Sequence, residues 1–145
     1  MTQFRGRGTV LAIALGLAAL ALWVYWPATA NGFVWDDPIV FDQQINAFHS
    51  ARDVLQPPKG IPQFGSHYYR PTIVATYLLD QALFGRDAFG YHLSVLLWHA
   101  LATVLVFLFG VQLSRGPEGG PGAIWPAALG GALFARGAVG RRTFA

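Results

Sequence analysis

Two long stretches of this chain carry no charged residue, and they set the expected architecture. The first runs from Gly8 to Trp35, with an apolar centre from Val10 to Trp26. A helix over residues 9–27 would measure about 28 Å, which is close to the roughly 30 Å of a bilayer's hydrocarbon core. We therefore predict a first transmembrane helix at 9–27, preceded by a short N-terminal segment.

Residues on either side of this stretch indicate its orientation. Arg5 and Arg7 precede it, so the N-terminal segment 1–8 is expected in the cytoplasm. Trp23 lies near its far end, as is typical of the headgroup boundary. The alternative is a signal peptide cleaved after the small residues 28–30. A retained helix is favoured, because the apolar run exceeds the roughly 7–15 residues of a signal's hydrophobic region.

The second uncharged stretch predicts a second transmembrane helix at 89–113, which returns to the cytoplasm. Residues 114–122 contain several Gly and Pro and predict a short cytoplasmic loop. The apolar segment 123–135 is too short to cross a bilayer, so we expect part of a third helix there. The tail 136–145 shows no apolar periodicity.

The segment between the two predicted helices, 28–88, is rich in aromatic residues. A structureless connection of this length would be unusual, and its aromatic side chains are too many to leave in water. We expect a folded extracytoplasmic loop. Residues 42–55 predict short helical or turn-rich structure, and Pro71–Phe84 predicts an interfacial helix with Asp80 facing outward. The expected fold class is all-α integral membrane.

Composition agrees with a membrane protein and narrows the chemistry. Hydrophobic residues make up 54% of the chain and charged residues 12%, whereas soluble domains carry about 25% charged residues. The basic residues are scattered, so the expected partner is the lipid bilayer and not nucleic acid. The absence of cysteine excludes disulfides and thiolate metal sites. Abundant Arg, Ala and Gly are typical of GC-rich bacterial genomes, which favours a bacterial cytoplasmic (inner) membrane.

Adjacent carboxylates, Asp36 and Asp37, follow the apolar residues Phe33–Trp35 near the predicted membrane boundary. Partial burial would raise the pKa of one carboxyl and suit a general base that takes a proton from a hydroxyl. The pair could also hold a divalent cation through oxygen ligands. On residue types alone an Asp-Asp-Pro turn is the commoner use, because Asp caps its own backbone and Pro38 restricts the next residue.

A second polar group, His67, Tyr69 and Arg70, comes just before the expected interfacial helix. Arg70 could bind a phosphate or pair with the carboxylates. Taken alone, this group is better explained as an interface anchor at the lipid headgroups. His92 and His99 share a helix face two turns apart, too far for one metal ion, so we expect them to pack against neighbouring helices.

The order of these features resembles a known family. An N-terminal helix is followed by Asn31–Asp37, Tyr69–Pro71 and Phe89–Leu93, and then by a leucine-rich helix containing His99–Leu101. This order is similar to the N-terminal region of GT-C-fold membrane glycosyltransferases. Within that group the chain most resembles the transmembrane and tetratricopeptide-repeat O-mannosyltransferases and the dolichyl-phosphate-mannose protein mannosyltransferases. The resemblance covers about residues 31–113.

The resemblance implies a GT-C-like set of N-terminal helices and a reaction. In the family, the first outer loop carries an acidic pair facing the active site, so Asp36 and Asp37 are expected to be catalytic. We hypothesise that His67, Tyr69 and Arg70 bind substrate. The implied reaction is transfer of a mannose-like sugar from a polyprenyl-phosphate donor to a hydroxyl group on protein or glycan.

The chain departs from the family pattern after Ala135, where Arg136–Arg142 fits neither an apolar span nor the expected loop. We expect a truncated or frame-shifted fragment that is inactive alone, because two full spans and part of a third cannot enclose a lipid-linked donor. The alternative is a small non-enzymatic membrane protein that serves in interaction or assembly. A third reading, if the first helix is cleaved, is a secreted or anchored binding domain.

Overall fold

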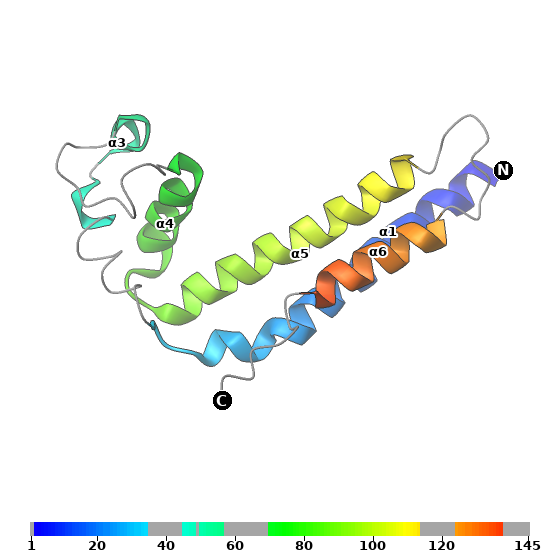
Figure 1. Cartoon of the computed structure of the whole chain (residues 1–145), viewed down its shortest axis with the longest axis horizontal. Helices are drawn as coiled ribbons and strands as arrows, with labels where there is room; N and C mark the ends of the chain where they lie inside the picture. Colours follow the sequence, from blue (N-terminus) through cyan, green and yellow to red (C-terminus); the bar gives the residue numbers. More distant parts are fainter. Residues whose placement is uncertain (1, 35–44, 49, 57–69, 114–123, 138–145) are drawn as a thin grey trace. The chain divides into compact units, whose positions relative to one another are not determined.

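The computed structural model describes residues 2–34, 45–48, 50–56, 70–113 and 124–137. All regular structure within these ranges is helical, and they contain no strand, which confirms the all-α class (Figure 1). The elements in chain order are α1 (Thr2–Tyr25), η1 (Trp26–Ala30), η3 (Ile45–Ala47), α3 (Ala51–Leu55), α4 (Pro71–Phe84), α5 (Ala88–Leu113) and α6 (Ile124–Arg136).

The chain divides into two compact units. Residues 29–94 form the unit that we call the loop unit, and residues 1–28 with 95–145 form the bundle unit. The helix α5 contributes its first turns to the loop unit and the remainder to the bundle unit.

Two stretches, Arg7–Ala30 and Ala88–Leu113, are long and apolar enough to cross a membrane. Only 17% and 28% of their most apolar windows are buried inside the protein. A core helix of a soluble protein would bury most of its apolar side chains, whereas Leu15 and Leu105 are 63% and 55% exposed. Exposing such an apolar surface carries no free-energy penalty in the hydrocarbon of a bilayer. The exposure of these helices therefore supports the interpretation that the chain is a membrane protein.

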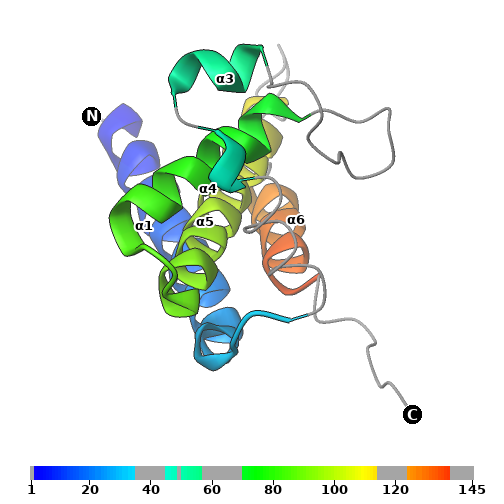
Figure 2. The same ribbon diagram turned by 90° about the vertical axis from the view of Figure 1, so that its left-hand side faces the viewer.

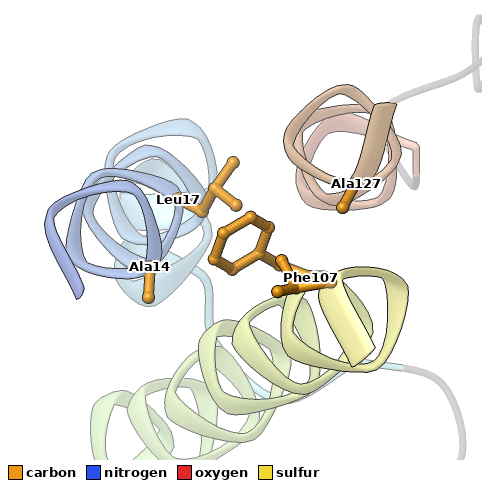
Figure 3. Packing of buried hydrophobic residues seen from close by; sticks show 5 residues of the cluster. Ala14, Leu17, Phe107 and Ala127 are labelled. Carbon is orange, nitrogen blue, oxygen red and sulfur yellow. The ribbon is translucent and has the colours of Figure 1, made fainter. Parts of the chain in front are cut away.

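The bundle unit packs α1, α6 and the later part of α5 together. In Figure 1, α1 and α6 run in the same direction, and α5 runs opposite to them. One layer of the core centres on Phe107, which is fully buried and directs its ring towards Leu17 and between the helices (Figure 3). Ala14 of α1 and Ala127 of α6 complete this layer of the core.

A second layer of the bundle unit consists of Ala21, Ala100 and Ala135, one alanine from each helix. Each alanine lies seven or eight residues, about two turns, from a residue of the first layer: Ala21 from Ala14, Ala100 from Phe107 and Ala135 from Ala127. This repeat keeps small side chains on the facing surfaces and lets the backbones approach closely, as membrane helices do.

The loop unit is organised by a tight connection between α4 and α5. Pro71 starts α4 at its first turn, and Gly85 ends it with a positive φ of 63°. The Asp87 carboxylate then accepts a hydrogen bond of 3.1 Å from the backbone N–H of Phe89 and starts α5. Gly90 lies directly against the Phe84 ring, where any added Cβ would overlap it.

Aromatic side chains form the core of the loop unit around Tyr91. Phe33 meets Tyr91 edge to face with ring centroids 5.4 Å apart, and Tyr77 lies 6.1 Å from it. Ile45 is 1% exposed in the same cluster. The short helix α3 lies beside α4 (Figure 2), with Ser50 and the third helical residue closing a capping box. Within the described part of this segment, Phe33, Ile45 and Tyr77 are therefore packed together with Tyr91.

One orientation expected from the sequence is wrong. The helix α4 has the predicted bounds, Pro71–Phe84, but Asp80 does not face outward. Its side chain is 7% exposed, and Ser94 donates a hydrogen bond of 2.5 Å to its Oδ1. The expectation assumed that water would lie on the outer face of α4, whereas a carboxylate is stabilised wherever a donor is available.

Candidate functional site

Arg70 is the predicted site residue that the structure describes. It is the N-cap residue of α4, and its side chain is exposed and makes no capping hydrogen bond. Its carbonyl oxygen accepts hydrogen bonds of 3.1 Å from the N–H groups of Ile73 and Val74. The backbone of Arg70 is thus fixed by the helix, while its guanidinium group projects from the protein surface.

The other predicted site residues, Asp36, Asp37, His67 and Tyr69, lie outside the described residues. The predictions that the two aspartates act as a general base or hold a divalent cation therefore stay predictions. Among the residues that the structure does describe, no group of three His, Cys, Asp or Glu side chains could hold a metal ion.

The structure does fix both ends of the segment that carries the acidic pair. Phe33 and Ile45 both pack in the cluster around Tyr91. The described residues on the two sides of positions 35–44 therefore meet in one aromatic cluster.

Sequence reasoning missed the buried polar pair of Asp80 and Ser94. The two residues are brought together by the turn between α4 and α5, at a separation of 14 positions in the chain. The Tyr91 hydroxyl donates a hydrogen bond of 3.1 Å to the carbonyl of Gly85 and closes the same turn. The sequence carries one signal for the pair, because Asp80 is the one charged residue in an otherwise uncharged helix.

His99 lies in the bundle unit in contact with α1 and α6. Its ring stacks on Phe134 at 5.4 Å and meets Tyr25 edge to face at 4.9 Å. Nε2 lies 3.3 Å from the carbonyl oxygen of Ala135 and must carry a proton to donate to it. The prediction that His99 packs against neighbouring helices is confirmed. His92 is half-buried, and its Nε2 has no hydrogen-bond partner among the described residues.

An open apolar hollow lies at the end of the first span. It is lined by Leu22, Trp23, Trp26 and Pro27, with Trp23 77% exposed. No charged side chain lines it, so it offers an apolar contact and no group for acid, base or nucleophilic chemistry.

The fold and this geometry define an all-helical protein with two helices that could span a membrane. Comparison of the chain with protein-family models, with curated proteins and with solved structures found no match.

Proposed function

We propose that the chain forms the N-terminal part of a membrane glycosyltransferase, which transfers a mannose-like sugar from a polyprenyl-phosphate donor to a hydroxyl group. The proposal rests on the ordered sequence motifs and on one structural observation. Phe33 and Ile45, which flank the acidic pair in the sequence, both pack in the core of the loop unit. That core includes Tyr91 in the first turn of α5, which is one of the two candidate spans.

This packing suits a lipid-linked donor. The polyprenyl tail of such a donor stays in the bilayer while its phosphate and sugar lie at the boundary. Phe33, which precedes the acidic pair in the sequence, packs on Tyr91 in the first turn of a candidate spanning helix, and we propose that the carboxylates meet the sugar at that boundary. An exposed cation, Arg70, begins a helix of the same unit and would approach the donor's phosphate.

The proposed chemistry is a single displacement. One carboxylate, from Asp36 or Asp37, takes the proton of the acceptor hydroxyl as its oxygen attacks the anomeric carbon. The bond between the anomeric carbon and the phosphate oxygen breaks, and the electron pair leaves with polyprenyl phosphate. The guanidinium group of Arg70 stabilises the negative charge that develops on the leaving group. His67 and Tyr69 complete the donor site.

The test is sugar transfer from a radiolabelled polyprenyl-phosphate donor, measured in membranes that carry a version of the chain extended by further helices of such an enzyme. We expect Asp36→Asn or Asp37→Asn to lower the rate by roughly 10²–10⁴-fold, because a general base is lost. Asp87→Asn is the matched control. Its exposed side chain keeps an oxygen that can accept the hydrogen bond from Phe89.

Unchanged transfer by the double variant Asp36→Asn with Asp37→Asn would show that the acidic pair is not catalytic. An equal loss in Asp87→Asn would attribute the effect to folding of the loop unit. Arg70→Ala tests the role of the cation: because its guanidinium group stabilises charge that develops on the leaving phosphate, its loss should lower kcat more than it raises KM.

A further inference from the structure

The helix α4 has its charged residue inside and its large aliphatic residues outside. Asp80, the one charged residue among positions 71–84, is also the most buried of them at 7% exposure. Leu79 and Leu83 are 54% and 64% exposed. These two residues, with the exposed Ala82 between them, define what we call the outer face of α4. A helix packed on a core from water would show the opposite arrangement.

Three polar side chains of α4, those of Thr76, Asp80 and Gln81, are hydrogen-bonded within the protein. Asp80 is bound by Ser94, and the amide of Gln81 donates a hydrogen bond of 3.2 Å to the side-chain oxygen of Asn46. The hydroxyl of Thr76 donates to the carbonyl of Ile73 in its own helix, at 2.8 Å. Such internal pairing is what a helix requires where no water is available to its side chains.

The contact with Ser94 also sets the depth of α4. Ser94 lies six residues after the first residue of α5, or about 9 Å along that helix. If α5 spans the bilayer, the hydrogen bond from Ser94 to Asp80 places the middle of α4 at the level of Ser94.

We propose that the outer face of α4 lies against lipid acyl chains, so that α4 is a membrane-embedded helix too short to cross the bilayer. Its 14 residues reach about 21 Å, less than the roughly 30 Å of the hydrocarbon core. The outer face of α4 then continues the lipid-facing surface of α5, on which Phe89 is 42% exposed. This proposal rests on the membrane placement of α5 and not on sugar transfer.

The chain contains no cysteine, so single cysteines can be introduced and spin-labelled without removing others. The labelled variants are Leu79→Cys and Leu83→Cys on the outer face of α4. Leu105→Cys, on an exposed position of α5, is the reference for hydrocarbon, and Arg52→Cys, on an exposed position of α3, is the reference for water. Each labelled chain is reconstituted in phosphatidylcholine vesicles.

Electron paramagnetic resonance then measures collision of each label with oxygen, which concentrates in hydrocarbon, and with a water-soluble nickel chelate. We expect labels at positions 79 and 83 to give an oxygen-to-nickel ratio close to that at position 105 and well above that at position 52. A ratio close to that at position 52 would overturn the proposal. Low collision with both reagents would also overturn it, because another protein surface would then cover the face.

Two further measurements ensure that every outcome either supports or contradicts the proposal. Ala82→Cys labels a smaller exposed residue on the same side of α4, and its ratio decides the result if a label at position 79 or 83 disturbs the helical circular dichroism. A water-like ratio at position 105 would show that α5 is not in the bilayer, and the proposal for α4 would fall with it. Loss of sugar transfer alone would change neither ratio.

Discussion

The bundle unit and the loop unit are stabilised in opposite ways. Inside the bundle unit, the contacts between helices are made by alanines, Leu17 and Phe107, and the exposed surface is equally apolar. Inside the loop unit, the buried contacts include a carboxylate, hydroxyls and aromatic rings, while the outer face of α4 is aliphatic. In neither unit, therefore, are the buried residues distinguished from the exposed ones by being more apolar.

This comparison teaches which interaction defines each unit. Where the surroundings are as apolar as the core, helices gain little from hydrophobic burial and depend on close fit. Close fit in the bundle unit comes from small residues. Because the helices approach closely at these positions, there is no space there for a larger side chain. In the loop unit, specificity comes from polar partners that would be costly to leave unpaired. Substitutions that change volume should therefore damage the bundle unit, and substitutions that remove a donor should damage the loop unit.

The largest effect is expected from added volume at Gly131 in α6. A Cβ there would lie 2.8 Å from Cδ1 of Leu17 and 3.2 Å from Cβ of Phe107. We expect Gly131→Val to lower the free energy of unfolding of the bundle unit by about 3 kcal/mol. The Cβ atom of Phe107 is attached to the backbone of α5 and cannot move away from the added side chain. The measurement is the loss of helical circular dichroism in mixed micelles titrated with dodecyl sulfate.

The neighbouring residue provides a matched control for this prediction. A Cβ at Gly130 meets no atom within 4 Å, and this residue is exposed. Gly130→Val makes the same change in helix propensity, so the difference between the two variants isolates packing. Equal destabilisation by both would show that close fit between α1, α5 and α6 does not hold the bundle unit together.

A smaller effect is expected from removing the donor to Asp80. Ser94→Ala leaves the Asp80 carboxylate buried without its hydrogen bond, and we expect a loss of about 2 kcal/mol. Amide hydrogen exchange of α4 in reconstituted vesicles measures this loss, which corresponds to exchange roughly 30-fold faster.

The double variant Asp80→Leu with Ser94→Ala shows whether the effect belongs to the pair. Replacing both partners by apolar groups leaves no unpaired charge, so α4 should regain most of its protection against exchange. Exchange in Ser94→Ala that matched the parent chain would mean that water reaches Asp80. That result would also remove one argument for embedding α4 in lipid.

The presence of the long helices could be predicted from the sequence, because it depends on local signals. Charge-free runs predict α1 and α5, although α1 begins at Thr2 and not at the predicted residue 9, and the bounds of α4 follow from Pro71 and Gly85. The direction of Asp80 could not be predicted, because it depends on Ser94 in another helix. The rule that places polar groups outward assumes water outside, and it fails for a helix with an aliphatic outer face.

In the candidate site too, contacts between residues far apart in the sequence could not be predicted. Residue types and order predicted an acidic pair and a nearby cation, and the structure gives the exposure of Arg70. The packing of Phe33 and Ile45 on Tyr91 could not be predicted, because Tyr91 lies far along the chain from both residues. Aromatic content predicted a packed loop without indicating which rings would meet.

The smallest effect is expected at His99, a polar residue whose ring lies between helices of the bundle unit. Its Nε2 donates to the carbonyl of Ala135 in the last turn of α6, where the helix's own amides no longer supply a donor. We expect His99→Ala to cost about 1 kcal/mol, the usual worth of a hydrogen bond between membrane helices. Amide exchange in the last turn of α6 should become roughly 5-fold faster, with little change in α4.

His92→Ala is the control on the same helix, because the Nε2 of His92 has no partner to lose among the described residues. Faster exchange in α6 for both variants would show that the contact with Ala135 is not what secures α6, and that the bundle unit depends on close fit alone.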